Sequence, residues 1–175
     1  MQVIDNTLVL RTRHPTKIQT NIPSSDSVRK DNDIYTIKMR WDLLTAQRLA
    51  KLRMKNIPSP IMRDYKWTGL YAPMEHQKTT AEFLTLNPRA FCFNEQGTGK
   101  TGAAIWASDY LLSEGFIDRV LIICPLSIMK SAWEADLYKF APHRSLGVAH
   151  GAKEKRKKII ENDYEYIIIN YDGIN

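Results

Sequence analysis

The stretch CFNEQGTGKT, Cys92–Thr101, decides the fold because it joins two runs of different periodicity through a turn that contains glycines. The run AFCFN predicts a short buried strand, and the run KTGAAIWASDYLLSEG predicts a helix that stops at a glycine. A strand, a glycine turn and a helix in this order are typical of a loop that binds phosphate groups. We therefore expect residues 94–101 to form such a loop.

The residue types in this turn suit a nucleoside triphosphate. Gly97 and Gly99 let backbone N–H groups curl around phosphates, and a helix that begins near Lys100 points its positive end at the anion. Lys100 is expected to reach the β- and γ-phosphates of ATP, and Thr101 to place its hydroxyl on Mg²⁺. These two residues are the candidate catalytic pair. The candidate nucleotide-binding set is completed by Asn94, Glu95, Gln96 and Thr98.

Downstream of the loop, apolar runs alternate with helix-like runs. RVLIICP and YEYIIIN predict buried strands, and SLGVAH predicts a weaker one. SIMKSAWEADLYKFA and AKEKRKKIIEND predict helices, as does EHQKTTAEFLTL upstream of the loop. Apolar strands separated by helices indicate an α/β fold, with a parallel sheet covered by helices on both faces.

The N-terminal part has the pattern of a small α+β domain. NTLVLRT and IYTIKMRW predict strands, and HPTKIQTNIPSSDSVRKDND between them predicts a loop. DLLTAQRLAKLRMK predicts a helix with Asp42 as its N-cap, and NIPSPIMRDYKWTGLYAP predicts an extended linker. We therefore expect an accessory domain over residues 1–62 and a nucleotide-binding domain over residues 63–175.

The net charge of +6 is concentrated at one end of the chain. Residues 1–70 hold 13 basic and 6 acidic residues, whereas residues 71–175 hold 12 and 13. This asymmetry favours contact with a polyanion such as DNA, with ordinary solubilising charge as the alternative. The candidate phosphate contacts are Arg11, Arg13, Lys38, Arg40, Arg48, Lys51, Arg53 and Lys55. KEKRKK, residues 153–158, favours the solvated face of a helix over a DNA-binding segment.

Other compositional features narrow the class of protein. Cys92 and Cys124 lie in apolar runs, which predicts reduced core residues, and the four histidines lack metal-ligand spacing. The N-terminus does not resemble a signal peptide, and no run of 18 apolar residues occurs. We expect a soluble chain in the cytoplasm.

Four motifs in order resemble the Swi2/Snf2 group of superfamily 2 helicases: YAPMEHQ, NEQGTGKT, VLIICPLSIMKSAWEADLYKF and YEYIIINYDGIN. The resemblance covers residues 71–175. Within it, the chain is similar to helicases of phages and to annealing helicases of the HARP type. If a phage encodes the chain, the expected location is the host cytoplasm. The strict phosphate-loop pattern has Gly where this chain has Asn94, and the Snf2 loop has an acidic residue there.

The resemblance implies the first part of a RecA-like lobe that uses ATP and Mg²⁺ to move on duplex or branched DNA, with a second RecA-like lobe as its partner. It implies that Gln77 binds the adenine edge, that Tyr71 packs on the base and that Tyr171 faces DNA. Ser127 follows a predicted strand, where it is expected to cap the next helix and leave N–H groups for a DNA phosphate. Lys130, one turn later, is a further candidate contact.

Hydrolysis in this family also needs an Asp-Glu pair, and the sequence contains none. We therefore expect the isolated chain to bind nucleotide and DNA without turnover. Two other functions stay open: a non-catalytic module that binds DNA or protein, and a small phosphate-loop kinase.

Overall fold

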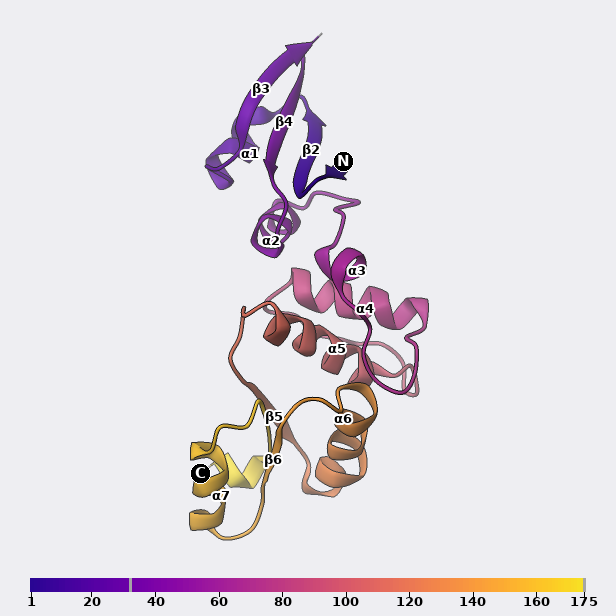
Figure 1. Cartoon of the computed structure of the whole chain (residues 1–175), viewed down its shortest axis with the longest axis vertical. Helices are drawn as coiled ribbons and strands as arrows, with labels where there is room; N and C mark the ends of the chain where they lie inside the picture. The colour runs from indigo at the N-terminus through magenta and orange to yellow at the C-terminus, as the bar shows by residue number, and fades with distance from the viewer. Residues whose placement is uncertain (32, 175) are drawn as a thin grey trace. The chain divides into compact units, whose positions relative to one another are not determined.

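The computed structural model describes residues 1–31 and 33–174, and Figure 1 traces their helices and strands. The chain divides into two compact units. Unit 1 comprises residues 1–65 and 82–91, and unit 2 comprises residues 66–81 and 92–175. The division falls within helix α4, Glu75–Leu86, which begins and ends where the sequence predicts.

Unit 1 is built on an antiparallel sheet of order β1-β2-β4-β3. Its strands are β1 (Gln2–Ile4), β2 (Thr7–Thr12), β3 (Asp26–Asp31) and β4 (Ile34–Arg40). Leu8 pairs with Met39 and Leu10 with Ile37, and all four side chains are buried. Alternate residues of paired strands share one face of a sheet, so the two strands predicted from period-two patterns are confirmed.

The expected loop between these strands is wrong for most of its length. It contains helix α1 (Pro15–Asn21) and strand β3, which pairs with β4; Asn32 lies outside the described residues. Pro15 occupies the first turn of α1, where its missing N–H costs nothing. Ile18 and Ile22 lie four residues apart and enter the core of unit 1. Tertiary burial of these two side chains overrides a polar, turn-like sequence.

Two further helices follow in unit 1. Helix α2 (Leu43–Lys51) is capped as predicted, because the Asp42 carboxylate accepts a hydrogen bond from the Thr45 N–H at 2.8 Å. Helix α3 (Pro60–Asp64) interrupts the segment expected to be an extended linker. Ile61 is fully buried within α3, which explains why a helical turn forms between prolines.

Unit 2 contains a parallel sheet of order β5-β7-β6, formed by β5 (Val120–Cys124), β6 (Leu146–Ala149) and β7 (Tyr166–Asn170). On one face, β5 and β7 pack with α5 (Lys100–Ser113) and α6 (Ala135–Phe140) through Ile105, Ile168 and Leu137. On the other face, Ile167 and Ile169 pack with Ile159 of α7 (Lys153–Glu161). The fold is thus the expected α/β arrangement with helices on both faces of a parallel sheet.

Three details of unit 2 differ from the prediction. Residues 90–94, expected as a buried strand, have no regular structure, and Phe93 is 89% exposed. A strand requires a neighbour's backbone groups, and no described strand pairs with this segment. Strand β5 has one exposed face, at Leu121 and Ile123. The helix expected after β5 consists of a 3₁₀ turn (Leu126–Ile128), a π-helical segment (Met129–Glu134) and α6.

The two cysteines differ in burial, and two tryptophans contribute to the core of unit 2. Cys124 is buried and Cys92 is half-buried, and neither is in a disulfide. Trp106 is buried, and Trp133 packs against the cluster between α5 and the sheet. Among the helices of the described residues, none is both long and apolar enough to cross a membrane.

Candidate nucleotide-binding site

The glycine turn of unit 2 passes through two left-handed glycines into a helix. Gly97 and Gly99 have φ angles of 80° and 75°, in the left-handed region that favours glycine. Helix α5 begins at Lys100, immediately after Gly99, as the sequence predicts. A Cβ atom added at Gly97 would meet no atom within 4 Å, so the space beside this residue is open. The positive end of a 14-residue helix therefore lies directly behind an exposed turn.

The Lys100 ammonium is held against the backbone of this loop. Its Nζ donates to the carbonyl oxygens of Asn94 at 2.9 Å and Glu95 at 2.7 Å. The Thr98 hydroxyl also donates to Glu95 O, at 2.8 Å, which closes the turn. The side chain of Asn94 donates to Thr80 Oγ1 at 2.8 Å and so ties the loop to α4. Asn94 thus anchors the loop, a role that its Gly counterpart in the strict pattern has no side chain to perform.

Gln77 contacts the loop directly. Its Oε1 accepts from the Met74 N–H at 3.0 Å, and its Nε2 donates to Thr98 O at 3.3 Å. A Cβ atom at Gly99 would lie 2.2 Å from Gln77 Nε2, so a side chain there would displace the Gln77 amide from the loop. The structure therefore places Gln77 beside the loop, with one amide hydrogen and one lone pair of Oε1 outside these contacts.

His76 is a loop contact that the sequence reasoning missed. Its Nε2 lies 3.0 Å from Thr98 O, the same oxygen that Gln77 approaches. An exposed histidine in the first turn of a helix carries no pattern that distinguishes it from a solvated side chain. Only the fold of unit 2, which brings α4 against the loop, reveals this contact.

The other residues predicted to contact the nucleotide differ in exposure and in their position relative to the loop. Thr101 is half-buried in the first turn of α5, whereas Glu95 and Gln96 are exposed in the loop. Tyr71 is 61% exposed, and its ring centroid lies 6.5 Å from that of Phe140. No measured contact joins Tyr71 to the loop among the described residues, so its role on the base remains a prediction.

Ser127 and Lys130 lie beyond the carboxyl end of β5, where the sequence analysis expected DNA contacts. Both line a groove of about 420 Å³ together with Ser131 and His150, which follows β6. The expected cap at Ser127 is wrong, because Ser127 lies inside the 3₁₀ turn. Its carbonyl instead accepts from Ser131 Oγ at 2.9 Å. The turn begins one residue earlier, with Pro125 in the N-cap position.

Tyr171 follows β7 directly, in the 3₁₀ turn Tyr171–Ile174, and is 59% exposed. Arg40 and Arg48 belong to unit 1 and are also exposed. Arg40 lies 3.8 Å from an Asp42 oxygen, a weak exposed ion pair that does not neutralise the Arg40 charge effectively.

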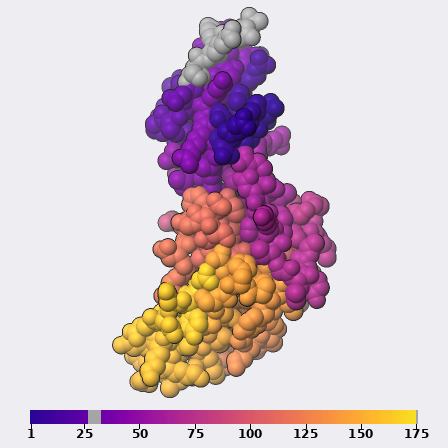
Figure 2. All heavy atoms as spheres, viewed as in Figure 1, coloured from indigo at the N-terminus to yellow at the C-terminus, as the bar shows by residue number. Residues whose placement is uncertain are grey.

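Helix α7, which carries residues 153–158, has no buried residue and forms part of the surface in Figure 2. This arrangement agrees with a solvated helix face.

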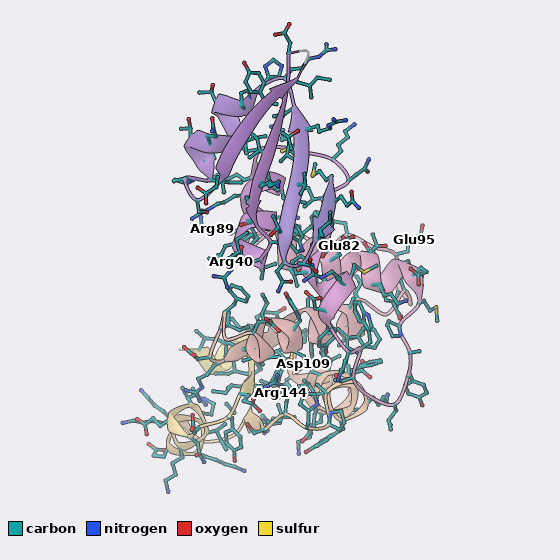
Figure 3. The ribbon with its side chains drawn as sticks, turned by 45° about the horizontal axis from the view of Figure 1, so that its top comes forward. Arg40, Glu82, Arg89, Glu95, Asp109 and Arg144 are labelled. Atoms are coloured by element: carbon teal, nitrogen blue, oxygen red, sulfur yellow. The ribbon has the colours of Figure 1, made fainter. Side chains whose placement is uncertain are left out.

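A buried charge network, also missed by the sequence reasoning, fixes the far end of α5. Asp109 on α5 accepts from Arg144 Nε at 2.5 Å and from Thr68 Oγ1 at 3.2 Å. Arg144 Nη1 also donates to Glu165 Oε1 at 2.6 Å, and Figure 3 shows the side chains of Asp109 and Arg144 together. Burial acts to raise the pKa of Glu165, but the Ser145 N–H and the Arg144 guanidinium outweigh it and lower that pKa. The network therefore anchors the helix whose other end forms the loop.

The chain has a partial RecA-like α/β fold, and a glycine turn leads into one of its helices. This combination is typical of ATPase cores, which bind phosphate at such a loop. Residues 61–175 match the family ResIII, described as the type III restriction enzyme, res subunit. The chain belongs to this family. The SWI2/SNF2 ATPase core of Sulfolobus solfataricus, solved in complex with double-stranded DNA, has 31% sequence identity and a TM-score of 0.52. The similarity covers 61% of this chain and 23% of that one.

No curated protein matches the chain. The family and the structural similarity confirm the coarser part of the resemblance stated from the motifs, namely a helicase-like chain related to the SWI2/SNF2 ATPases. The phage-type and HARP-type characters stay predictions. The chain spans 23% of the length of this solved relative.

Proposed function

We propose that this chain supplies the ATP-binding part of an ATP-dependent DNA helicase or translocase of the Snf2-like type. The observation that carries the proposal is the exposed turn with two left-handed glycines immediately before α5. Its open backbone, the helix end and one lysine together match the chemistry of a polyphosphate. The family match and the similarity to a SWI2/SNF2 ATPase core support ATP as the nucleotide.

Different groups of the loop are proposed to bind the phosphates of ATP and the Mg²⁺ ion. The backbone amides of residues 95–101 and the Lys100 ammonium bind the phosphates, and the Thr101 hydroxyl is a ligand for Mg²⁺. Bound Mg²⁺ would neutralise charge on the phosphates during hydrolysis. Gln77 presents its remaining donor and acceptor to the adenine edge, and Tyr71 offers an exposed ring for the base.

Hydrolysis requires groups that this chain does not provide. An Asp-Glu pair must hold Mg²⁺ and orient water, and arginines from a second RecA-like lobe must stabilise the transition state. Among the described strands β5 pairs only with β7, and it exposes Leu121 and Ile123. Its free edge offers backbone groups to a further strand, which we propose carries the Asp-Glu pair. We therefore expect binding of ATP by the isolated chain without turnover.

DNA is the proposed track, contacted mainly through phosphates. Ser127 and Lys130 line the groove beyond β5, and Tyr171 follows β7 at the same carboxyl edge of the sheet. Ligands of parallel sheets collect at this edge. The solved relative is a complex with double-stranded DNA, which supports duplex DNA as the partner. Arg40 and Arg48 are proposed to add phosphate contacts from unit 1.

Replacing Lys100 by Ala tests the nucleotide site. We expect the affinity for a fluorescent ATP analogue with Mg²⁺ to fall by roughly 10- to 100-fold, because a charge-assisted contact worth about 1.5–3 kcal/mol is lost. The matched control is Lys153→Ala, which removes an exposed lysine of α7 and should leave the affinity unchanged. Fluorescence titration of both variants against the unaltered chain measures the difference.

Equal ATP affinity of the Lys100→Ala variant and the unaltered chain would contradict the proposed site. DNA binding without any ATP binding would favour the non-catalytic module instead. Steady ATP hydrolysis by the chain alone, lost in Lys100→Ala, would contradict the expected absence of turnover.

A further inference from the structure

Helix α2 has two contrasting faces. Leu43, Ala46 and Leu49 are buried against unit 1. The opposite face, formed at helical spacing by Leu44, Gln47, Arg48 and Lys51, lines a groove of about 630 Å³. The other wall is the end of α4 with the residues that follow it, and includes Arg89, which Figure 3 labels. We call this feature the α2 groove.

The two walls of the α2 groove are held in place by hydrogen bonds. Gln47 Nε2 on α2 donates to Thr85 O on α4 at 2.8 Å. Asn87 Nδ2 donates to Phe83 O at 2.8 Å, which closes the end of α4. Pro88 has a φ angle fixed by its ring and restricts the backbone of the preceding Asn87. The groove is therefore formed before any ligand arrives, which reduces the entropic cost of binding.

The α2 groove has the charge of an anion site. Arg48, Lys51 and Arg89 line it, and none of its lining residues is acidic. Within the part of the chain that the structure describes, none of these cations has a carboxylate within 4 Å. Guanidinium groups match phosphate oxygens in pairs, and an ammonium adds a point charge. Their charge is available to a ligand because no internal ion pair uses it.

Apolar surface accompanies these cations. Leu44 is 51% exposed, and Leu86 and Pro88 also line the groove. A ligand that alternates anionic groups with apolar ones would contact both kinds of surface. The sugar–phosphate backbone has this alternation, whereas inorganic phosphate would leave the apolar part uncovered.

We propose that the α2 groove binds the sugar–phosphate backbone of DNA, with Arg48, Lys51 and Arg89 as its phosphate contacts. This inference rests on the proposed function, in that it presumes that the chain acts on DNA. It adds a site in unit 1 that is separate from the sheet edge of unit 2. It also selects Arg48 and Lys51 from the many basic residues of the N-terminal part and adds Arg89, which lies outside that part.

The test is binding of a fluorescent 20-base-pair duplex by the whole chain, measured by anisotropy at several salt concentrations. The groove variant carries Arg48→Gln, Lys51→Gln and Arg89→Gln. The control variant carries Lys153→Gln, Lys155→Gln and Lys158→Gln on α7, and so loses the same charge from exposed positions. We expect the groove variant to bind roughly tenfold or more weakly, with the slope of log K against log salt reduced by about 2.7. The control should change by less than about threefold, and circular dichroism of both variants should match the unaltered chain.

Several results would overturn the proposal. If the groove variant binds the duplex as the unaltered chain does, the α2 groove is not a DNA site, although the proposed function stands. If both variants weaken equally, the effect is one of total charge. If polyglutamate binds as tightly as the duplex and loses affinity in the groove variant, the groove is a docking site for acidic protein. If the unaltered chain does not bind duplex, the DNA part of the proposed function fails together with the groove.

Discussion

Replacing Asp109 by Ala is expected to destabilise unit 2 by about 3–5 kcal/mol, because it breaks a buried ion pair from one side. Asp109 is fully buried, and the side chain of Arg144 is only 13% exposed. Removing the carboxylate leaves Glu165 as the one carboxylate paired with the guanidinium among the described residues. It also removes the acceptor that Thr68 and His143 share. The midpoint of urea unfolding, followed by tryptophan fluorescence, measures the loss.

A double variant separates the effect of an uncompensated charge from the effect of lost packing. In Asp109→Leu with Arg144→Met, apolar side chains replace both charges, and stability should recover to within about 1–2 kcal/mol of the unaltered chain. A loss in the double variant as large as in Asp109→Ala would show that packing, and not an uncompensated charge, causes the effect. ATP affinity of the folded fraction should be nearly unchanged, because Asp109 lies at the far end of α5 from Lys100.

Replacing Gly69 by Ala is expected to cost about 2–6 kcal/mol through backbone strain and steric overlap. Gly69 has a φ angle of 104°, which residues with a Cβ atom rarely adopt. Its Cβ atom would lie 2.4 Å from Lys139 O and 2.7 Å from Phe140 Cα, both backbone atoms at the end of α6. The adjacent Leu70 N–H donates to Lys139 O at 2.7 Å, so the segment cannot move away without breaking this bond. Thermal unfolding of the variant measures the cost.

Gly115→Ala provides the control for Gly69→Ala. Gly115 ends α5 in a left-handed conformation, with a φ angle of 68°, and a Cβ atom there would meet no atom within 4 Å. Its substitution should cost only about 1 kcal/mol, the strain of the φ angle without overlap. Equal stability losses in the two variants would contradict the steric argument for Gly69.

The local features of the nucleotide loop could be predicted from sequence because adjacent residues carry them. Within four positions, Gly97 and Gly99 form a turn and Lys100 supplies a cation at the start of a helix. Helix α5 begins at the expected residue. The strands β5 and β7 were predictable as apolar runs, and β6 less clearly so. The cap at Asp42 followed from one side chain and the next turn of backbone.

Contacts between distant segments required the tertiary structure. The sequence does not show that His76 and Gln77 converge on Thr98 O, that Asp109 meets Arg144, or that Arg89 lines a groove with α2. The errors have the same origin: α1 forms because the core buries Ile18 and Ile22, whereas residues 90–94 stay irregular because strands need a neighbour. Short-range order follows from residue type and spacing. Burial and pairing depend on which segments meet, and only the folded chain decides that.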